Sequence, residues 1–127
     1  MNKGGQEENK ETIYHVIADY KALYPNPIVV HTGEELIVGN EDPEYPGWVW
    51  CTARNEKSGW VPEDCIDHEA KGAKARYDHG ATELSVNLGE LLVISKVKYG
   101  WAWCTNQNNQ SGWVPLTNLE VETSDVE

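Results

Sequence analysis

The sequence contains no phenylalanine, a single methionine and only three cysteines in 127 residues. Three is an odd number, and it lies far below the cysteine density of a disulfide-stabilised secreted domain. We therefore expect reduced thiols, no structural disulfide and a cytoplasmic protein. Tryptophan and tyrosine, six of each, supply the aromatic side chains, and their N–H and O–H groups suit interfaces as well as cores.

Basic residues and long apolar runs are also scarce. Ten Lys and Arg stand against 21 Asp and Glu, which gives a formal net charge of −11. Such a surface repels phosphate backbones and anionic lipid headgroups, so we expect neither nucleic acid nor membrane as a partner. No stretch approaches the roughly 20 apolar residues that span a bilayer, and the start MNKGGQEENKET lacks the apolar segment of a secretion signal. The composition indicates a soluble globular chain.

The chain contains an internal repeat. GWVWCTARNEKSGWVP at residues 47–62 recurs as GWAWCTNQNNQSGWVP at residues 100–115, and GEELIV at 33–38 recurs as GELLVI at 89–94. The first copy is longer between these blocks, where it carries the acidic segment NEDPEY at 40–45. An insertion confined to a charged, proline-containing stretch is typical of a surface loop.

The repeat predicts two small domains. The predicted boundaries are a polar tail at 1–12, a first domain at 13–67, a linker at 68–72, a second domain at 73–122 and an acidic tail at 123–127. Domains of this size bury only about 60% of the surface that their unfolded chains expose, so each is marginal alone. We expect the two domains to lean on each other.

Short β-rich runs bounded by Gly, Pro and Asn, without a sustained 3.6-residue period, predict strands throughout. The clearest element is a hairpin in each repeat, with its turn at Asn55 or at Asn108. Alternation then places small apolar side chains on the inner face and tryptophans on the outer face. The predicted cross-strand pairs are Trp48 with Pro62, Trp50 with Trp60, Trp101 with Pro115, and Trp103 with Trp113.

The order of these motifs resembles the Src-homology-3 (SH3) domain. Both copies carry Gly-Glu before an apolar strand, Gly-Trp-x-Trp, a short hairpin and Gly-Trp-Val-Pro. ARYDH at 75–79 and ELSV at 83–86 look like the family's Ala-Leu-Tyr-Asp-Tyr and Glu-Leu-Ser-Phe, and VIADY at 16–20 is a looser match. The resemblance implies an all-β fold of two tandem five-stranded SH3-like small barrels joined by a short linker, nearest to the variant form of short prokaryotic proteins.

The same template implies one core in each domain. The first would hold Val16, Ile28, Val30, Leu36, Val38, Val49, Cys51, Val61 and Ile66. The second would hold Ala75, Leu84, Val86, Leu92, Ile94, Ala102, Cys104, Val114 and Leu119.

No group of residues indicates catalysis. An enzyme needs a nucleophile, a base and a charge stabiliser that converge, and the Cys, His and carboxylate positions supply no such set. Cys51 and Cys104 recur at inward positions, as small buried residues do. The four histidines lack metal-ligand spacing, and the glycines punctuate turns. We predict no catalytic residue, no metal and no cofactor.

The resemblance also implies a groove in each domain that binds a proline-rich peptide in polyproline II form. The positions that would line the grooves are Tyr20, Trp48 and Pro62 in the first domain, and Tyr77, Trp101 and Pro115 in the second. The family's remaining tyrosines are replaced by Ala18 and Cys65, and by His79 and Asn118. Recognition of proline motifs is therefore expected to be shallow or altered, and its absence is the alternative.

Charge distinguishes the two predicted grooves. In the family, acidic residues beside the groove pair with an Arg or Lys of the ligand. Glu41, Asp42 and Glu44 in the inserted loop correspond to one such flank, so a basic peptide would prefer the first domain. The alternative is an acidic loop that only keeps the surface solvated.

The outward tryptophans Trp50, Trp60, Trp103 and Trp113 form a separate feature. They either stabilise the hairpins as cross-strand pairs or form an interface, between the barrels or with a second chain in a homo-oligomer. The function we favour is a non-catalytic adaptor that binds a protein or a proline-rich or basic peptide. The alternatives are a structural self-association module and a pair of cell-wall or glycan-binding domains.

Overall fold

The computed structural model describes residues 12–122, which form twelve short strands and two 3-10 helices. The elements are β1 (Ile13–Val16), β2 (Val29–Val30), β3 (Glu35–Glu41), β4 (Trp48–Thr52), β5 (Ser58–Pro62), η1 (Glu63–Cys65), β6 (Ile66–Glu69), β7 (Gly72–Ala75), β8 (His79–Gly80), β9 (Leu91–Lys98), β10 (Trp101–Thr105), β11 (Ser111–Pro115), η2 (Leu116–Asn118) and β12 (Leu119–Val121). The tails predicted at 1–12 and 123–127 lie outside the described residues, except for Thr12.

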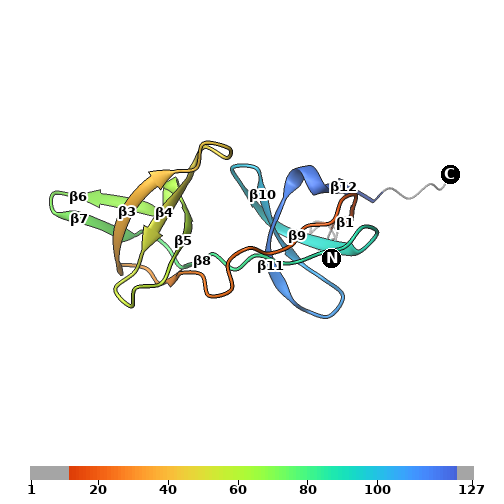
Figure 1. The fold of residues 1–127 in the computed structure, drawn as a ribbon, viewed down its shortest axis with the longest axis horizontal. Coiled ribbons are helices and arrows are strands. Elements are labelled where there is room, and N and C mark those ends of the chain that lie inside the picture. The colour runs from red at the N-terminus through yellow and green to blue at the C-terminus, as the bar shows by residue number, and fades with distance from the viewer. Residues whose placement is uncertain (1–11, 123–127) are drawn as a thin grey trace, which may run out of the picture.

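The strands form two lobes (Figure 1). The first lobe, residues 28–81, holds a five-stranded sheet of order β5-β4-β3-β7-β6 and the short β2–β8 pair. The second lobe, residues 13–20 and 83–121, holds a five-stranded sheet of order β11-β10-β9-β1-β12. Two five-stranded antiparallel sheets are consistent with SH3-like barrels, so the predicted all-β fold class is confirmed.

The predicted hairpins are present with the predicted register. Trp48 lies opposite Pro62 and Trp50 opposite Trp60, and in the second copy Trp101 lies opposite Pro115 and Trp103 opposite Trp113. The paired rings of Trp50 and Trp60 pack edge to face with centroids 5.0 Å apart. Between the tryptophans, Cys51 and Cys104 point inward and are fully buried, as predicted.

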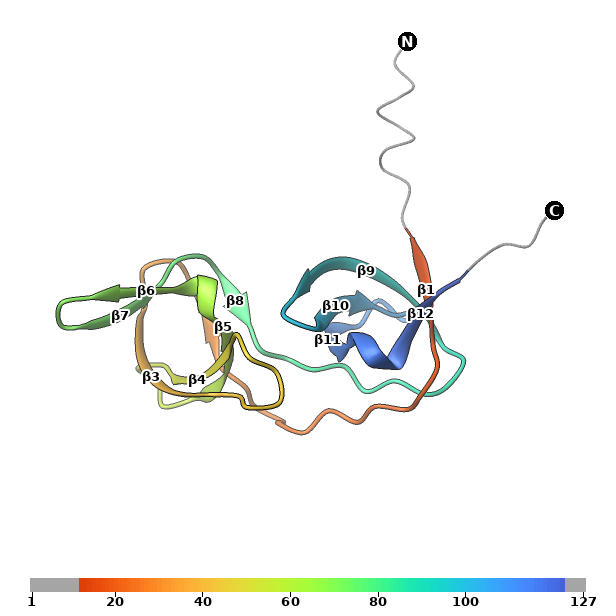
Figure 2. The ribbon, with the colours of Figure 1, turned by 90° about the horizontal axis from the view of Figure 1, so that it is seen from above.

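The two lobes exchange their first strands. β1, which opens the first repeat, pairs with β9 and β12 of the second lobe. β7, which opens the second repeat, pairs with β3 and β6 of the first lobe. Figure 2 shows the two chain segments that cross between the lobes, one before β2 and one after β8. They pair through Tyr20 and Val86, whose backbones exchange hydrogen bonds of 2.8 and 2.9 Å.

The exchange follows from the short connection between β6 and β7. Only Ala70 and Lys71 separate these strands, and Glu69 lies opposite Gly72, so the two strands form a tight hairpin. Gly72 has a φ of +129°, a backbone conformation that residues other than glycine rarely adopt. Pairing β6 with β7 closes a loop of two residues, whereas pairing β6 with β1 would close the whole segment between the end of β1 and the start of β6. The shorter loop loses less conformational entropy when it closes. The segment 68–72, predicted as a linker, is therefore a hairpin turn with its flanking strand ends.

The exchange also corrects the predicted cores. Val16 is fully buried in the core of the second lobe, and Ala75 is 2% exposed in the core of the first. The sequence placed each of them in the opposite core. Val38 is 37% exposed rather than buried, at the point where the β3–β4 ladder shifts register, and Ile94 is only partly buried. The other predicted core residues are buried in the predicted lobes.

Fragments will test the exchange. A fragment of residues 24–82 contains the whole core of the first lobe, including β7 and β8, and should give a dispersed amide NMR spectrum. A fragment of residues 13–67 lacks β7, which lies between β3 and β6, and should give the narrow dispersion of an unfolded chain. A folded 13–67 fragment together with an unfolded 24–82 fragment would show that the strands are not exchanged.

Candidate functional site

Each predicted groove is built from both repeats. Tyr77 packs against the core of the first lobe, whose groove carries Trp48 and Pro62. Tyr20 packs edge to face on Trp101 of the second lobe, with ring centroids 5.6 Å apart. The predicted partners, Tyr20 with Trp48 and Tyr77 with Trp101, are therefore interchanged, because each tyrosine lies on the segment that follows an exchanged strand.

The first groove is covered by the second lobe. Trp48 is only 4% exposed, and its indole Nε1 donates a hydrogen bond of 3.1 Å to the carbonyl oxygen of Tyr99. Its ring packs edge to face on Trp113, with centroids 5.1 Å apart. Pro62 is fully buried. In this state neither Trp48 nor Pro62 offers the aromatic ridge that the sequence predicted.

An ion pair also bridges the lobes at the first groove. The Lys98 ammonium donates to one carboxylate oxygen of Asp64, and the Tyr77 hydroxyl donates to the other, each at 2.5 Å. Lys98 also lies 5.4 Å from the centre of the Tyr77 ring. Burial alone would raise the pKa of Asp64, but the hydrogen bonds from Lys98 and Tyr77 outweigh it and hold the pKa below its usual value. Burial and the Asp64 carboxylate raise the pKa of Tyr77, so its hydroxyl remains a donor.

The second groove is more open. Trp101 is half-buried between two tyrosine rings, Tyr20 at 5.6 Å and Tyr45 at 5.3 Å. Within residues 12–122, its indole nitrogen has no hydrogen-bond partner, in contrast to that of Trp48. The Tyr20 hydroxyl donates to Glu83 at 2.6 Å, and burial with this carboxylate raises the pKa of Tyr20. Pro115 is buried.

The inserted acidic loop of the first repeat reaches the second groove. Glu41 accepts a hydrogen bond from the backbone N–H of Gly47 at 2.8 Å, and Asp42 accepts one from that of Glu44 at 2.9 Å. These bonds shape the loop that carries Tyr45 onto Trp101. Asp42 and Glu83 then line a small cleft beside Trp101, of about 20 Å³. This volume is enough for about one water molecule.

His79 is a buried residue at the junction of the lobes. It is 4% exposed, lies 6.0 Å from the rings of both Trp48 and Trp113, and brings Nε2 within 2.9 Å of the Trp60 carbonyl oxygen. Burial lowers the pKa of His79 to about 4, and Lys96 adds to the effect. The imidazole is therefore neutral at pH 7 and donates from Nε2, since a carbonyl only accepts. The sequence marked this position only as a replaced groove tyrosine.

Two of the four outward tryptophans, Trp60 and Trp113, line the cleft between the lobes. Trp113 is 3% exposed, and its indole donates to the Gly80 carbonyl oxygen at 2.9 Å. The Lys96 ammonium lies 5.6 Å from its ring. Trp50, Trp60 and Trp103 are half-buried. The burial of Trp113 thus arises from contacts between the two lobes of one chain.

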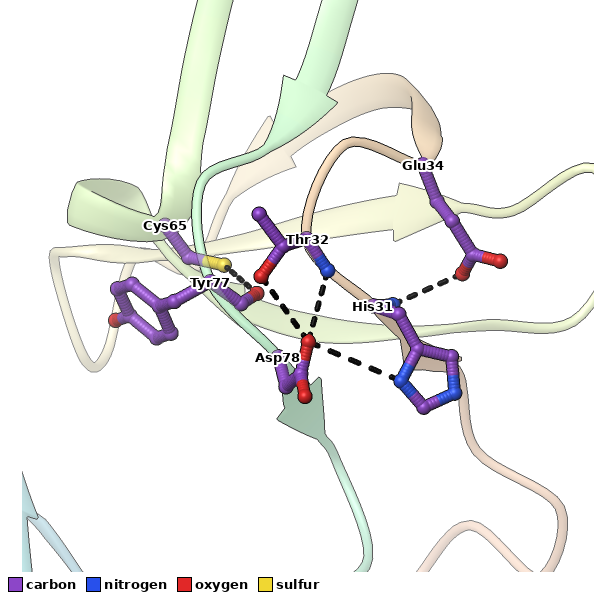
Figure 3. A network of polar contacts seen from close by, with 6 residues as sticks. All are labelled: His31, Thr32, Glu34, Cys65, Tyr77 and Asp78. Carbon is purple, nitrogen blue, oxygen red and sulfur yellow. Dashed lines mark hydrogen bonds and ion pairs between the residues drawn. The ribbon is translucent and has the colours of Figure 1, made fainter.

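A polar network anchors the exchanged segment to the first lobe (Figure 3). The Asp78 carboxylate accepts from the backbone N–H of Thr32 at 2.8 Å and from its hydroxyl at 3.1 Å, which lowers the pKa of Asp78. The Cys65 thiol donates to the Tyr77 carbonyl oxygen at 3.2 Å. Cys65 stands where the family resemblance predicts a groove tyrosine. In the structure its hydrogen bond holds the segment that follows β7 against the first lobe.

Between residues 12 and 122, no three His, Cys, Asp or Glu side chains converge on a point where they could hold a metal ion. Over the same range, no helix has the length and apolarity needed to cross a membrane.

Comparison with known proteins agrees with the fold. Residues 13–67 match the family model of the variant SH3 domain. This part of the chain is therefore a variant SH3 domain, a class that generally mediates protein interactions and is generally non-catalytic. No curated protein matches the chain. The match follows the sequence of the first repeat, whereas the folded lobe takes its first strand from the second.

The buried His79 predicts a pH-dependent stability. In the unfolded chain its pKa returns to about 6.5, so between pH 7 and pH 5 the unfolded state binds a proton that the folded state does not. The free energy of unfolding should fall by about 2 kcal/mol over this range, as measured by urea titration at each pH. The variant His79→Phe should show a much flatter dependence.

His31 provides the control for this experiment, because its side chain is 67% exposed. The variant His31→Gln should keep the pH dependence of the wild type. Equal slopes for wild type and His79→Phe would show that His79 titrates normally in the folded protein.

Proposed function

We propose that this protein is a non-catalytic adaptor with an SH3 domain in each repeat, and that it binds an extended, basic segment of a protein partner through the second groove. The observation that carries the proposal is the state of Trp101. It is half-buried between Tyr20 and Tyr45, and its indole N–H has no partner within the described residues. A free donor on an aromatic surface is suited to a peptide carbonyl.

The shape of the groove favours an extended peptide. The rings of Tyr20 and Tyr45 pack against Trp101 in T-shaped pairs from two different lobes. A proline-rich segment in polyproline II form can lie across such ridges with little loss of entropy, because it is already extended before it binds. The strand exchange holds the Tyr20 side and the Tyr45 side of the groove in place before a ligand binds. This limits the entropic cost of ordering the groove on binding.

The charge of the groove favours a basic ligand. Asp42 and Glu83 line the cleft beside Trp101, and Glu44 is exposed on the same loop. Both Asp42 and Glu83 already accept hydrogen bonds from backbone N–H groups, so they are held in position. An Arg or Lys of the partner would meet fixed carboxylates, and the net charge of −11 would speed its approach.

The cysteines support a cytoplasmic location for this adaptor. Cys51, Cys65 and Cys104 are all free and buried. Burial raises the pKa of the Cys51 thiol to about 11 and that of Cys104 to about 12, which keeps both thiols protonated and unreactive at neutral pH.

A peptide titration tests the proposal. Proline-rich peptides with and without an arginine are added to the ¹⁵N-labelled full chain, and the indole N–H signals are followed by NMR. The Trp101 signal should shift most, and the arginine peptide should bind more tightly. The variant Trp101→Ala should weaken binding at least tenfold, because a groove aromatic of this kind is the usual hot spot.

The matched control is Trp50→Ala. Trp50 is also half-buried and also packs on a tryptophan and a tyrosine, but it lies on the outer face of the first lobe. Its loss should leave the affinity unchanged. A shift confined to Trp50 would instead move the binding surface to that face. A flat titration at millimolar peptide would end the case for an extended peptide ligand.

A further inference from the structure

We infer that the β3–β7 face, the outer surface of β4, β3, β7 and β6 in the first lobe, binds a second copy of this chain in a two-fold symmetric dimer. Figure 1 shows the β6–β7 hairpin at the end of the first lobe that lies farthest from the second lobe. The residues of this face line neither aromatic groove. The inference is therefore independent of the proposed function.

A row of alternating charges crosses the β3–β7 face. Arg54 Nη1 lies 3.6 Å from Glu35 Oε1. Glu35 lies opposite Lys74 on the neighbouring strand, and Lys74 lies opposite Asp67 on the next. The order across the sheet is thus basic, acidic, basic, acidic, and all four side chains are exposed. Exposed ion pairs contribute little to the stability of one chain, so these charges remain available to a second chain.

A row in this order is complementary to its own reverse. A two-fold axis that lies between β3 and β7 and runs along the strands would place Glu35 against the partner's Lys74. The same axis would place Arg54 against the partner's Asp67. Each contact then occurs twice, because a two-fold interface uses the same surface of both copies.

The same axis brings an exposed apolar side chain over a hollow. Ile37 is the next outward residue of β3 after Glu35, and it is 69% exposed. Gly72 lies beside it on β7, and a Cβ added to Gly72 would meet no atom within 4 Å. Ile37 and Gly72 together line two open hollows, of about 250 and 350 Å³. The axis would place Ile37 against the partner's Gly72, so each isoleucine would enter a hollow of the other copy.

The equivalent face of the second lobe lacks this pattern. Leu91 there lies opposite His15, so the row has no alternating charge. Ile13 lies opposite Val93 and fills the space that is open beside Ile37. Val93 is half-buried, whereas Ile37 is exposed. Self-complementarity is therefore a property of the first lobe and not of the shared fold.

Charge balance also distinguishes the β3–β7 face. The net charge of −11 makes two copies of the chain repel each other over most of their surface. Four of the eight Lys and Arg between residues 12 and 122 lie on this face or at its edge, together with three acidic residues. The basic ones are Arg54, Lys71, Lys74 and Arg76, and the acidic ones are Glu35, Asp67 and Glu69. Two copies can therefore approach here without strong repulsion.

Reciprocal charge reversal in the full chain tests the interface. Sedimentation velocity is recorded from micromolar to millimolar concentration at physiological ionic strength. The wild type should dimerise, and E35K and K74E should each lose at least tenfold in dimer affinity, because each variant places like charges against each other twice. An equimolar mixture of E35K and K74E should recover the dimer, since opposite charges then meet at both contacts.

Recovery in the mixture separates a contact between chains from a contact within one chain. Glu35 and Lys74 are also neighbours in one sheet, and mixing leaves the like charges within each variant unchanged. The mixed pair also carries the same total charge as two wild-type chains. A mixture that stays monomeric while the wild type dimerises would overturn the inference. A wild type that stays monomeric at millimolar concentration would overturn it as well.

A second pair of variants leaves the charge unchanged. Ile37→Ser removes the side chain that would enter the hollow and should weaken the dimer at least tenfold. The fold should persist, because Ile37 is 69% exposed, and a dispersed amide NMR spectrum checks this. The matched control is Leu88→Ser in the second lobe, where Leu88 is 68% exposed, and its dimer affinity should equal that of the wild type. Equal dimer affinities for the two variants would place the contact elsewhere and contradict the inference.

Discussion

The two-residue turn between β6 and β7 is the constraint on which the rest of the structure depends. It joins the last strand of the first repeat to the first strand of the second as a hairpin, so β7 completes the first lobe. β1 is then left to complete the second lobe, where it lies between β9 and β12. Two segments must cross between the lobes as a result, and they pair at Tyr20 and Val86, at the edge of the second lobe. A connection of ordinary linker length would not impose this exchange.

The junction that the exchange creates makes two similar repeats unequal. Trp48, His79 and Trp113 pack together between the lobes, and each is less than 5% exposed. Their polar atoms are paired with backbone carbonyls at Tyr99, Trp60 and Gly80, so burial leaves no donor unpaired at these positions. Trp101, the counterpart of Trp48, keeps part of its surface exposed, and its indole N–H has no partner among residues 12–122. Unequal coverage of two equivalent tryptophans gives one closed groove and one open groove.

Electrostatics supports the same division. Lys98 crosses to Asp64 and closes the first groove with an ion pair, whereas Asp42 and Glu83 leave the cleft beside Trp101 acidic. The inserted loop of the first repeat thus contributes its charge to the groove of the second lobe. The groove at Trp101 is thus acidic and partly open, and the groove at Trp48 is closed by a lysine of the same chain.

The sequence by itself determined whatever depends on local pattern. The all-β class, the hairpin registers at Trp50 and Trp103 and the burial of Cys51 and Cys104 all follow from alternation and turn residues, because cross-strand neighbours in a hairpin are set by the turn. Only the tertiary structure decided which lobe each first strand completes, and therefore which tyrosine meets which tryptophan. β1 and β7 open equivalent repeats and can fill equivalent places, so no local signal separates the two arrangements. Which arrangement forms depends on the length of the loop that must close between paired strands. That length is a property of the β6–β7 connection and not of the strands themselves.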